Sequence, residues 1–184
     1  MKGIIFNVLE KIVGEQYGEA TWDKLIESAG VSGAYTALGS YPDEELFALV
    51  GAASKALSLT PDEIVRWFGT NAIAHLAKAY PHFFTPHKDT RSFVLTLNDI
   101  IHPEVRKLYP GASVPDFSYH PLGDGRLGVE YSSPKKLCSL AEGLTLGAAK
   151  YFGQSATVEQ PRCMKRGDSS CMMVWSFGPA GSAG

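Results

Sequence analysis

The chain has 184 residues, 45% of them hydrophobic and 20% charged, with a formal net charge of −2, which predicts a single globular domain with a sizeable core. Because no basic cluster occurs, we expect no nucleic-acid partner. No apolar run reaches the roughly 18 to 20 residues of a spanning helix and no signal peptide is recognisable, so we expect a cytoplasmic protein without membrane association.

Helical patterns fill the first part of the chain. Apolar residues recur every three or four positions in five segments, which predicts five amphipathic helices. The clearest start is the capping box of Thr60 and Glu63, with Pro61 at the first helical position. The fifth helix is expected to begin after Thr90 and to continue to Pro103. The five segments are approximately 4–13, 22–30, 42–53, 60–76 and 90–102.

The period changes to two after Pro115, which is typical of strands. A hairpin is predicted with its turn at Gly123–Gly125, followed by a helix from Lys135 to about Phe152 and two further antiparallel strands. The expected strands are 117–120, 127–131, 156–160 and 172–176. The predicted fold class is therefore α+β, with a helical part (about 1–60), a second part (about 61–177) that holds a four-stranded antiparallel sheet, and a flexible tail (178–184).

His102 is the candidate that stands out. Its face of the predicted helix is apolar, so the imidazole should point into the core. Pro103 follows at once, and we expect it to bend the backbone and to hold His102 away from helical dihedral angles. A buried histidine is either satisfied by one hydrogen bond or serves as a metal ligand. The apolar residues on its face are Val94, Leu95, Val105 and Tyr109.

A second group of polar residues lies in the segment YSSPK. Tyr131, Ser133 and Lys135 alternate along an extended stretch and so project from one side of it. Two hydroxyls and an ammonium can satisfy a pair of buried carboxylates, and haem carries two carboxylates.

Together these residues resemble the signature of a known family. His102, twelve residues, Pro115, fifteen residues and then Tyr-x-Ser-x-basic is similar to the pattern of the haem-nitric oxide/oxygen-binding (H-NOX) domains, of the bacterial stand-alone type, which are akin to the haem domain of soluble guanylate cyclase. The resemblance covers the whole chain. It implies a single sensor domain (1–177) in which a b-type haem lies between the helices and the sheet.

The resemblance also implies roles for individual residues. His102 would be the axial ligand of the haem iron, and Tyr131, Ser133 and Lys135 would bind the propionates. Pro115 and Ile5 would press on the porphyrin. The family has arginine where this chain has Lys135, and an ammonium cannot make the two-pronged contact of a guanidinium, so Lys136 is a second candidate for this role.

The gas-binding side of the haem is expected to be apolar. Oxygen-binding relatives place a tyrosine where this chain has Leu140, which cannot donate a hydrogen bond. Leu9, Ala74 and Leu144 are the other expected pocket residues, and His75 is the one nearby side chain that could turn inward and donate. The resemblance therefore implies binding of nitric oxide, with carbon monoxide as a second ligand, and no stable oxygen complex.

We expect a sensor and not an enzyme, because no nucleophile with a base, no phosphate-binding loop and no paired carboxylates occur. By resemblance to stand-alone members, the signal would pass to a separate histidine kinase or cyclic-dinucleotide signalling enzyme. The alternative hypothesis is a haem-free regulatory module that binds a hydrophobic small molecule and holds zinc through its cysteines.

Three cysteines form a second candidate site. Cys138, Cys163 and Cys171 are predicted to lie near one another, and some bacterial relatives carry zinc in this region. Those relatives add a histidine where this chain has Gln160. Zinc with water or another side chain as fourth ligand, a redox-sensitive pair of Cys163 with Cys171, and plain buried thiols all remain open.

Overall fold

The computed structural model describes residues 1–180 and confirms the predicted α+β class. Short irregular helices are η1 (Pro81–Phe83), the π-helical η2 (Leu97–Ile101) and η3 (Met164–Arg166). The helices are α1 (Gly3–Tyr17), α2 (Glu19–Ala29), α3 (Asp43–Leu57), α4 (Pro61–Ala79), α5 (Thr90–Val94), α6 (His102–Leu108) and α7 (Cys138–Tyr151). The strands are β1 (Asp116–Pro121), β2 (Leu127–Ser132), β3 (Gln154–Arg162) and β4 (Cys171–Ala180).

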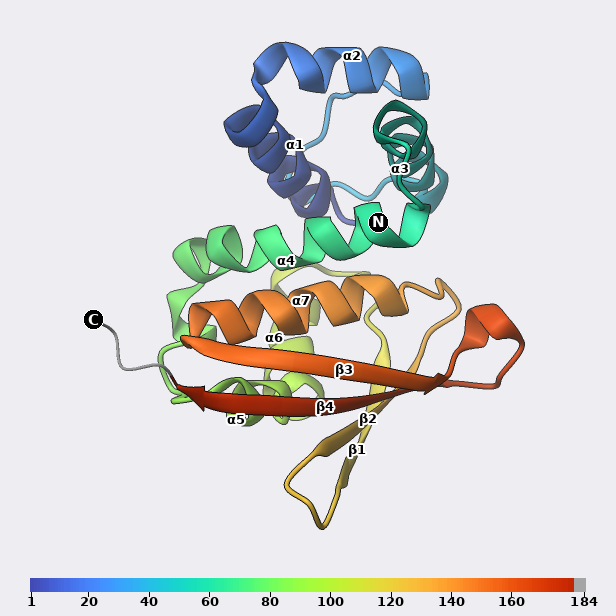
Figure 1. Cartoon of the computed structure of the whole chain (residues 1–184). Helices are drawn as coiled ribbons and strands as arrows, with labels where there is room; N and C mark the ends of the chain where they lie inside the picture. Colours follow the sequence, from blue (N-terminus) through green and yellow to red (C-terminus); the bar gives the residue numbers. More distant parts are fainter. Residues whose placement is uncertain (181–184) are drawn as a thin grey trace.

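The elements form three layers (Figure 1). Helices α1, α2 and α3 make up one end of the molecule, α4 and α7 lie side by side in the middle, and the antiparallel sheet lies beyond α7 with the strand order β1-β2-β4-β3. One hydrophobic cluster fills the space between α1, α3 and α4, and a larger one lies between the sheet, α7 and α5. No helix within residues 1–180 combines the length and apolarity that a membrane crossing needs.

Local sequence signals account for most element boundaries. Thr60 and Glu63 form the predicted capping box at the start of α4, with Pro61 at its first position. The hairpin register pairs Phe117 with Tyr131 and places Gly125 in the turn with a positive φ angle. The last helix begins at Cys138, three residues later than expected, because Lys136 adopts a left-handed conformation (φ 50°) that a helix cannot contain.

The predicted tail is too long. Strand β4 continues to Ala180, and the side-chain amide nitrogen of Gln154 donates a hydrogen bond to the carbonyl oxygen of Gly178 (2.9 Å). Residues 178–180 therefore belong to the sheet, and the remainder of the predicted tail, 181–184, lies outside the described residues.

The helix that carries His102 differs from the prediction. Instead of one helix up to Pro103, α5 ends at Val94 and is followed by the π-helical η2, after which α6 begins at His102. His102 has helical dihedral angles (φ −65°, ψ −39°), and Pro103 lies in the first turn of α6, where its missing N–H leaves no hydrogen bond broken. The expectation that Pro103 holds His102 away from helical dihedral angles is therefore wrong, and the backbone irregularity is the π-helix that ends directly before His102.

The π-helix also rotates the helix face that was expected to be apolar. A π-turn contains one more residue than an α-turn, so side chains before and after it lose their α-helical alignment. Val94 and Tyr109 are buried, whereas Leu95 is 36% exposed. Leu95 therefore does not share the inward face with His102.

Glycines allow α4 and α7 to pack at close distance. A Cβ atom added to Gly143 would lie 2.2 Å from the carbonyl oxygen of Arg66, and one added to Gly147 would lie 2.5 Å from the carbonyl oxygen of Thr70. The backbone of α4 therefore makes the close approach at these two glycines. Arg66 also makes a two-pronged ion pair with Glu142 across the same interface (2.7 and 3.0 Å).

Gly143→Ala is predicted to destabilise the protein by about 1–3 kcal/mol, because the added methyl group must push α4 away from α7. Gly51→Ala in α3 is the matched control, since a Cβ atom there meets open space and alanine favours the helix by roughly 0.5–1 kcal/mol. Thermal unfolding of both variants measures the effect. Equal melting temperatures for the two variants would show that the α4–α7 contact tolerates a side chain.

Candidate functional site

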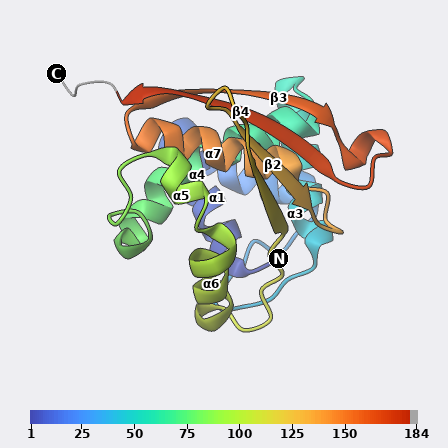
Figure 2. The ribbon, with the colours of Figure 1, turned by 90° about the horizontal axis from the view of Figure 1, so that it is seen from below.

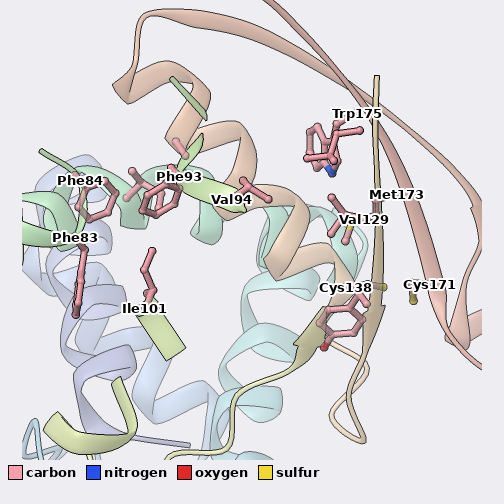
Figure 3. Packing of buried hydrophobic residues seen from close by; sticks show 14 of the residues in the cluster. Phe83, Phe84, Phe93, Val94, Ile101, Val129, Cys138, Cys171, Met173 and Trp175 are labelled. Carbon is pink, nitrogen blue, oxygen red and sulfur yellow. The ribbon is translucent and has the colours of Figure 1, made fainter. Parts of the chain in front are cut away.

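A cavity of about 380 Å³ lies where the helices face the sheet, a size typical of ligand sites. In Figure 2, α6 stands apart from α7 and from the sheet, and the residues of α6 form one wall of this cavity. Figure 3 shows buried side chains in two groups, one from η1, the residue after it, α5 and η2, and one from the sheet and the start of α7. The members that line the cavity are Phe83, Phe84, Phe93, Val94 and Ile101 in the first group and Val129 and Met173 in the second.

His102 lines this cavity from the start of α6. Its ring lies nearly parallel to that of Phe117, with 5.7 Å between the ring centroids. The Nδ1 atom is buried and has no hydrogen-bond partner. Buried polar atoms without a partner are rare, and those that occur often mark a functional group. The alternative interpretation was a core histidine whose ring makes one hydrogen bond. The Nδ1 atom makes no such bond, so it does not support this alternative.

The electrostatic surroundings keep His102 neutral. Burial, with a smaller contribution from the nearby positive charge of Arg106, lowers the pKa of His102 to about 4, and the opposing effect of Asp116 is weaker. The imidazole is therefore unprotonated at neutral pH, which is the form that binds metal ions. A neutral imidazole at the wall of a large apolar cavity fits the axial ligand of a haem.

Tyr131 and Ser133 line the cavity on the side of the sheet. Both are buried, with 2% and 7% of their surface exposed. The Tyr131 hydroxyl oxygen accepts a hydrogen bond from the backbone N–H of Leu137 (2.9 Å), and the Ser133 hydroxyl oxygen accepts one from the backbone N–H of Lys135 (3.3 Å). These contacts use the lone pairs of both hydroxyls and orient them, while each hydroxyl hydrogen can still be donated to an anionic group.

Lys135 also lines the cavity, and its ammonium is paired with Asp43 at the start of α3 (Nζ to Oδ1, 2.7 Å). The same carboxylate oxygen accepts a hydrogen bond from the amino group of Met1 (2.6 Å). Burial alone would raise the pKa of Asp43, but hydrogen bonds from Lys135 and the terminal amine lower it overall. Two cations share one carboxylate here, so a net positive charge remains at this edge of the cavity, which favours an anionic ligand group.

The other predicted pocket residues divide into two sets. Ile5, Pro115, Leu140 and Leu144 line the cavity as expected, whereas Leu9 and Ala74 do not. Leu9 lies one turn further along α1 than Ile5, where the helix packs in the cluster between α1, α3 and α4, and it lines a separate small void. Ala74 is exposed, because its neighbour Ile73 takes the inward position on α4.

Sequence reasoning missed several residues of this site. The segment from Tyr80 to Phe84 falls between the predicted helices 60–76 and 90–102, yet Tyr80, Phe83 and Phe84 line the cavity. The adjacent phenylalanines were a usable signal, since an exposed loop seldom needs them. Asp43 falls at the start of the predicted helix 42–53, which gave no indication of a role in the site. Its partner Lys135 is 92 residues away in the sequence, so no local pattern could have indicated the pair.

The three cysteines meet at one place, as predicted from their order. Their sulfur atoms all lie within 4.8 Å of one another, with Cys163 3.8 Å from both Cys138 and Cys171, and all three side chains are buried. Tetrahedral zinc with Zn–S bonds of about 2.3 Å separates its sulfur ligands by about 3.8 Å, so these distances suit such an ion. The side-chain nitrogen of Gln160 is buried without a partner. The spacing leaves zinc, a redox pair and plain thiols open.

Comparisons with known proteins agree with this arrangement. A model of the family described as Haem-NO-binding matches residues 2–160. The chain is similar to an H-NOX protein from Shewanella oneidensis in the Fe(II)NO ligation state, with 35% identity and a TM-score of 0.91 over 97% of this chain and 100% of that one. It is also similar to the IWP-051-bound H-NOX of Shewanella woodyi in the Fe(II)CO state, with 32% identity and a TM-score of 0.82 over 99% and 97% of the two chains.

The H-NOX protein from K. algicida has the same fold, with a TM-score of 0.86 and 24% identity over the full length of both chains. The family match spans most of the chain, and the resemblance inferred from His102, Pro115 and Tyr131 is confirmed. The chain belongs to the H-NOX family of haem-based gas-sensor domains.

Proposed function

We propose that this chain is a nitric oxide sensor in which His102 holds a b-type haem in the 380 Å³ cavity. The observation that supports the proposal most is the neutral imidazole of His102, which lines this cavity. The haem iron, when bound, supplies the position to which a diatomic gas binds. The structures of two similar H-NOX proteins were determined in the Fe(II)NO and the Fe(II)CO state. This is consistent with nitric oxide and carbon monoxide as ligands.

In this proposal the residues at the end of β2 and directly after it would bind the propionates. Tyr131 and Ser133 would donate their hydroxyl hydrogens, and Lys135 would supply the positive charge that Asp43 only partly compensates. Pro115 and Ile5, which line the same cavity, would press on the porphyrin.

The selectivity proposed for nitric oxide rests on the absence of a suitable donor near Leu140 among residues 1–180. Leu140 and Leu144 are apolar, and the hydroxyl of Thr145 already donates to the carbonyl oxygen of Ala141 (2.9 Å). His75, the residue that could have turned inward, faces Glu15 instead (Nε2 to Oε2, 3.4 Å) and does not line the cavity. Bound oxygen needs a hydrogen bond that nitric oxide does not, so we propose no stable oxygen complex.

We further propose that the signal passes to a separate protein, either a histidine kinase or a cyclic-dinucleotide signalling enzyme. The support for a separate partner is the match of this chain to the full length of the H-NOX protein from S. oneidensis, which consists of the same sensor fold.

For the cysteine cluster we propose a structural zinc ion. The zinc proposal predicts one equivalent of zinc per chain in the purified protein and loss of that zinc in Cys163→Ser. A metal-free protein with a disulfide between Cys163 and Cys171 would contradict it and would support the redox pair.

His102→Gly is predicted to lose haem during purification and to regain it when imidazole is added, because the small ligand replaces the missing nitrogen while the cavity persists. The absorption spectrum and the haem content measure this. His82→Gly, a change at an exposed histidine outside the cavity, is the control and should keep its haem. A wild-type spectrum for His102→Gly without imidazole would exclude His102 as the ligand.

Lys135→Met is predicted to speed haem transfer to apomyoglobin by about 10- to 100-fold, because it removes a charge worth roughly 1–3 kcal/mol beside the propionates while it keeps the alkyl chain. Lys136→Met is the matched control, since Lys136 is exposed and does not line the cavity. If only Lys136→Met released haem faster, the propionate contact would belong to Lys136.

Leu140→Tyr is predicted to create an oxygen complex in air that the wild-type protein lacks, because its hydroxyl supplies the missing donor. Leu140→Phe controls for size without the hydroxyl and should behave like the wild type. The visible spectrum of ferrous protein equilibrated with air is the measurement. An oxygen spectrum in the wild type, or in Leu140→Phe, would contradict the proposed selectivity.

A further inference from the structure

Helix α6 is weakly attached to the rest of the molecule, although it carries His102. None of its residues is fully buried, and among the described elements it makes extensive contact only with the adjoining η2. Figure 2 shows it standing apart from α7 and the sheet. The position of α6 must therefore depend on the contacts made by the residues directly before and after it.

The start of this segment is held by β1. The side chain of Asn98 in η2 both donates to the carbonyl oxygen of Phe117 and accepts a hydrogen bond from its backbone N–H (3.3 Å). This pair of bonds fixes the chain four residues before His102.

The other end is held by two tyrosines. Tyr109 follows the last residue of α6 and is only 8% exposed, and its hydroxyl shares a short hydrogen bond with the hydroxyl of Tyr80, which follows the last residue of α4. Both side chains line the cavity. Within residues 1–180, no other side-chain hydrogen bond or ion pair joins α6 or Tyr109 to another helix or strand.

The surroundings preserve this hydrogen bond. Burial, together with the hydrogen bond to Tyr80, raises the pKa of Tyr109 far above its ordinary value, so the Tyr109 hydroxyl stays protonated. A hydrogen bond at an apolar cavity is stronger than one in water, and removing one hydroxyl leaves the other without this partner.

We propose that the Tyr80–Tyr109 hydrogen bond positions His102 by holding the end of α6 to the end of α4. With both ends of the segment fixed, α6 has little freedom to move, so a haem held by His102 would be bound through a restrained ligand. Without the hydrogen bond, α6 and His102 could move together, and the restraint on the bond that His102 would make to the iron would be lower. This inference rests on the proposed role of His102 as haem ligand.

The first test measures the hydrogen bond itself in the full chain without haem. Tyr109→Phe and Tyr80→Phe should each raise amide hydrogen exchange in residues 102–109 by roughly five- to tenfold, the factor expected from one lost hydrogen bond. The double variant should exchange no faster than either single one, because the two hydroxyls act as a pair. Unchanged exchange in both single variants would overturn the proposal.

Tyr119→Phe is the matched control. It removes another tyrosine hydroxyl at a partly buried position, one that donates to the carbonyl oxygen of Val94 in α5 (2.8 Å) and, among the described residues, makes no hydrogen bond to α6. Exchange in residues 102–109 should match that of the wild type. An equal increase in this variant would show that the effect is general loosening and would contradict a specific role for Tyr80 and Tyr109.

The second test uses haem-loaded protein. Tyr109→Phe should shift the nitric oxide complex toward the form that keeps His102 on the iron, visible as a shift of the Soret band, and Tyr119→Phe should not. Fully loaded Tyr109→Phe with the wild-type distribution would overturn the positioning role. If the wild-type chain took up no haem, the proposed function would fail, and the exchange measurement would still decide whether the tyrosines hold α6.

Discussion

The site depends on one buried imidazole without a protein partner. Removing His102 from water while leaving Nδ1 unpaired costs free energy, and the structure provides no hydrogen bond to offset it. A haem in the adjoining cavity would leave Nδ1 unpaired, but the bond from the iron to the other ring nitrogen, Nε2, and the burial of the apolar lining would offset the cost. In this view haem binding and stability of the domain are coupled, because the same cavity is an apolar void when haem is absent.

Other parts of the fold place the groups around this imidazole. The glycines of α7 bring it against α4, so Leu140 and Leu144 reach the cavity from a helix that cannot shift without a backbone clash. The sheet presents Tyr131 and Ser133 from β2 and the segment that follows it, and Asp43 of α3 meets Lys135 from the far end of the chain. The helical part and the sheet therefore share one site, and Lys135 connects them directly.

Much of this could be predicted from the sequence. Capping residues, turn glycines and apolar periodicity predicted four of the first five helices and all four strands, because these signals act locally. The π-helix before His102 was not predicted. Proline disrupts the interior of a helix, so a disturbance was expected at Pro103, but Pro103 lies in the first turn of α6, where proline is tolerated. Leu9 and Ala74 were predicted to line the pocket and do not. The resemblance to the family indicates which helix carries each residue, but not which side of that helix faces the cavity in this chain.

The pairs of distant residues lay beyond any local rule. Two pairs meet only after the helices have packed, Asp43 with Lys135 and Tyr80 with Tyr109, so their interactions exist only in the folded chain.

The central claim, that His102 holds haem, is tested most directly by a crystal structure of the protein as purified. We predict density for one haem in the cavity, with its iron bonded to the Nε2 atom of His102. An empty cavity, or iron held by another residue, would contradict the account.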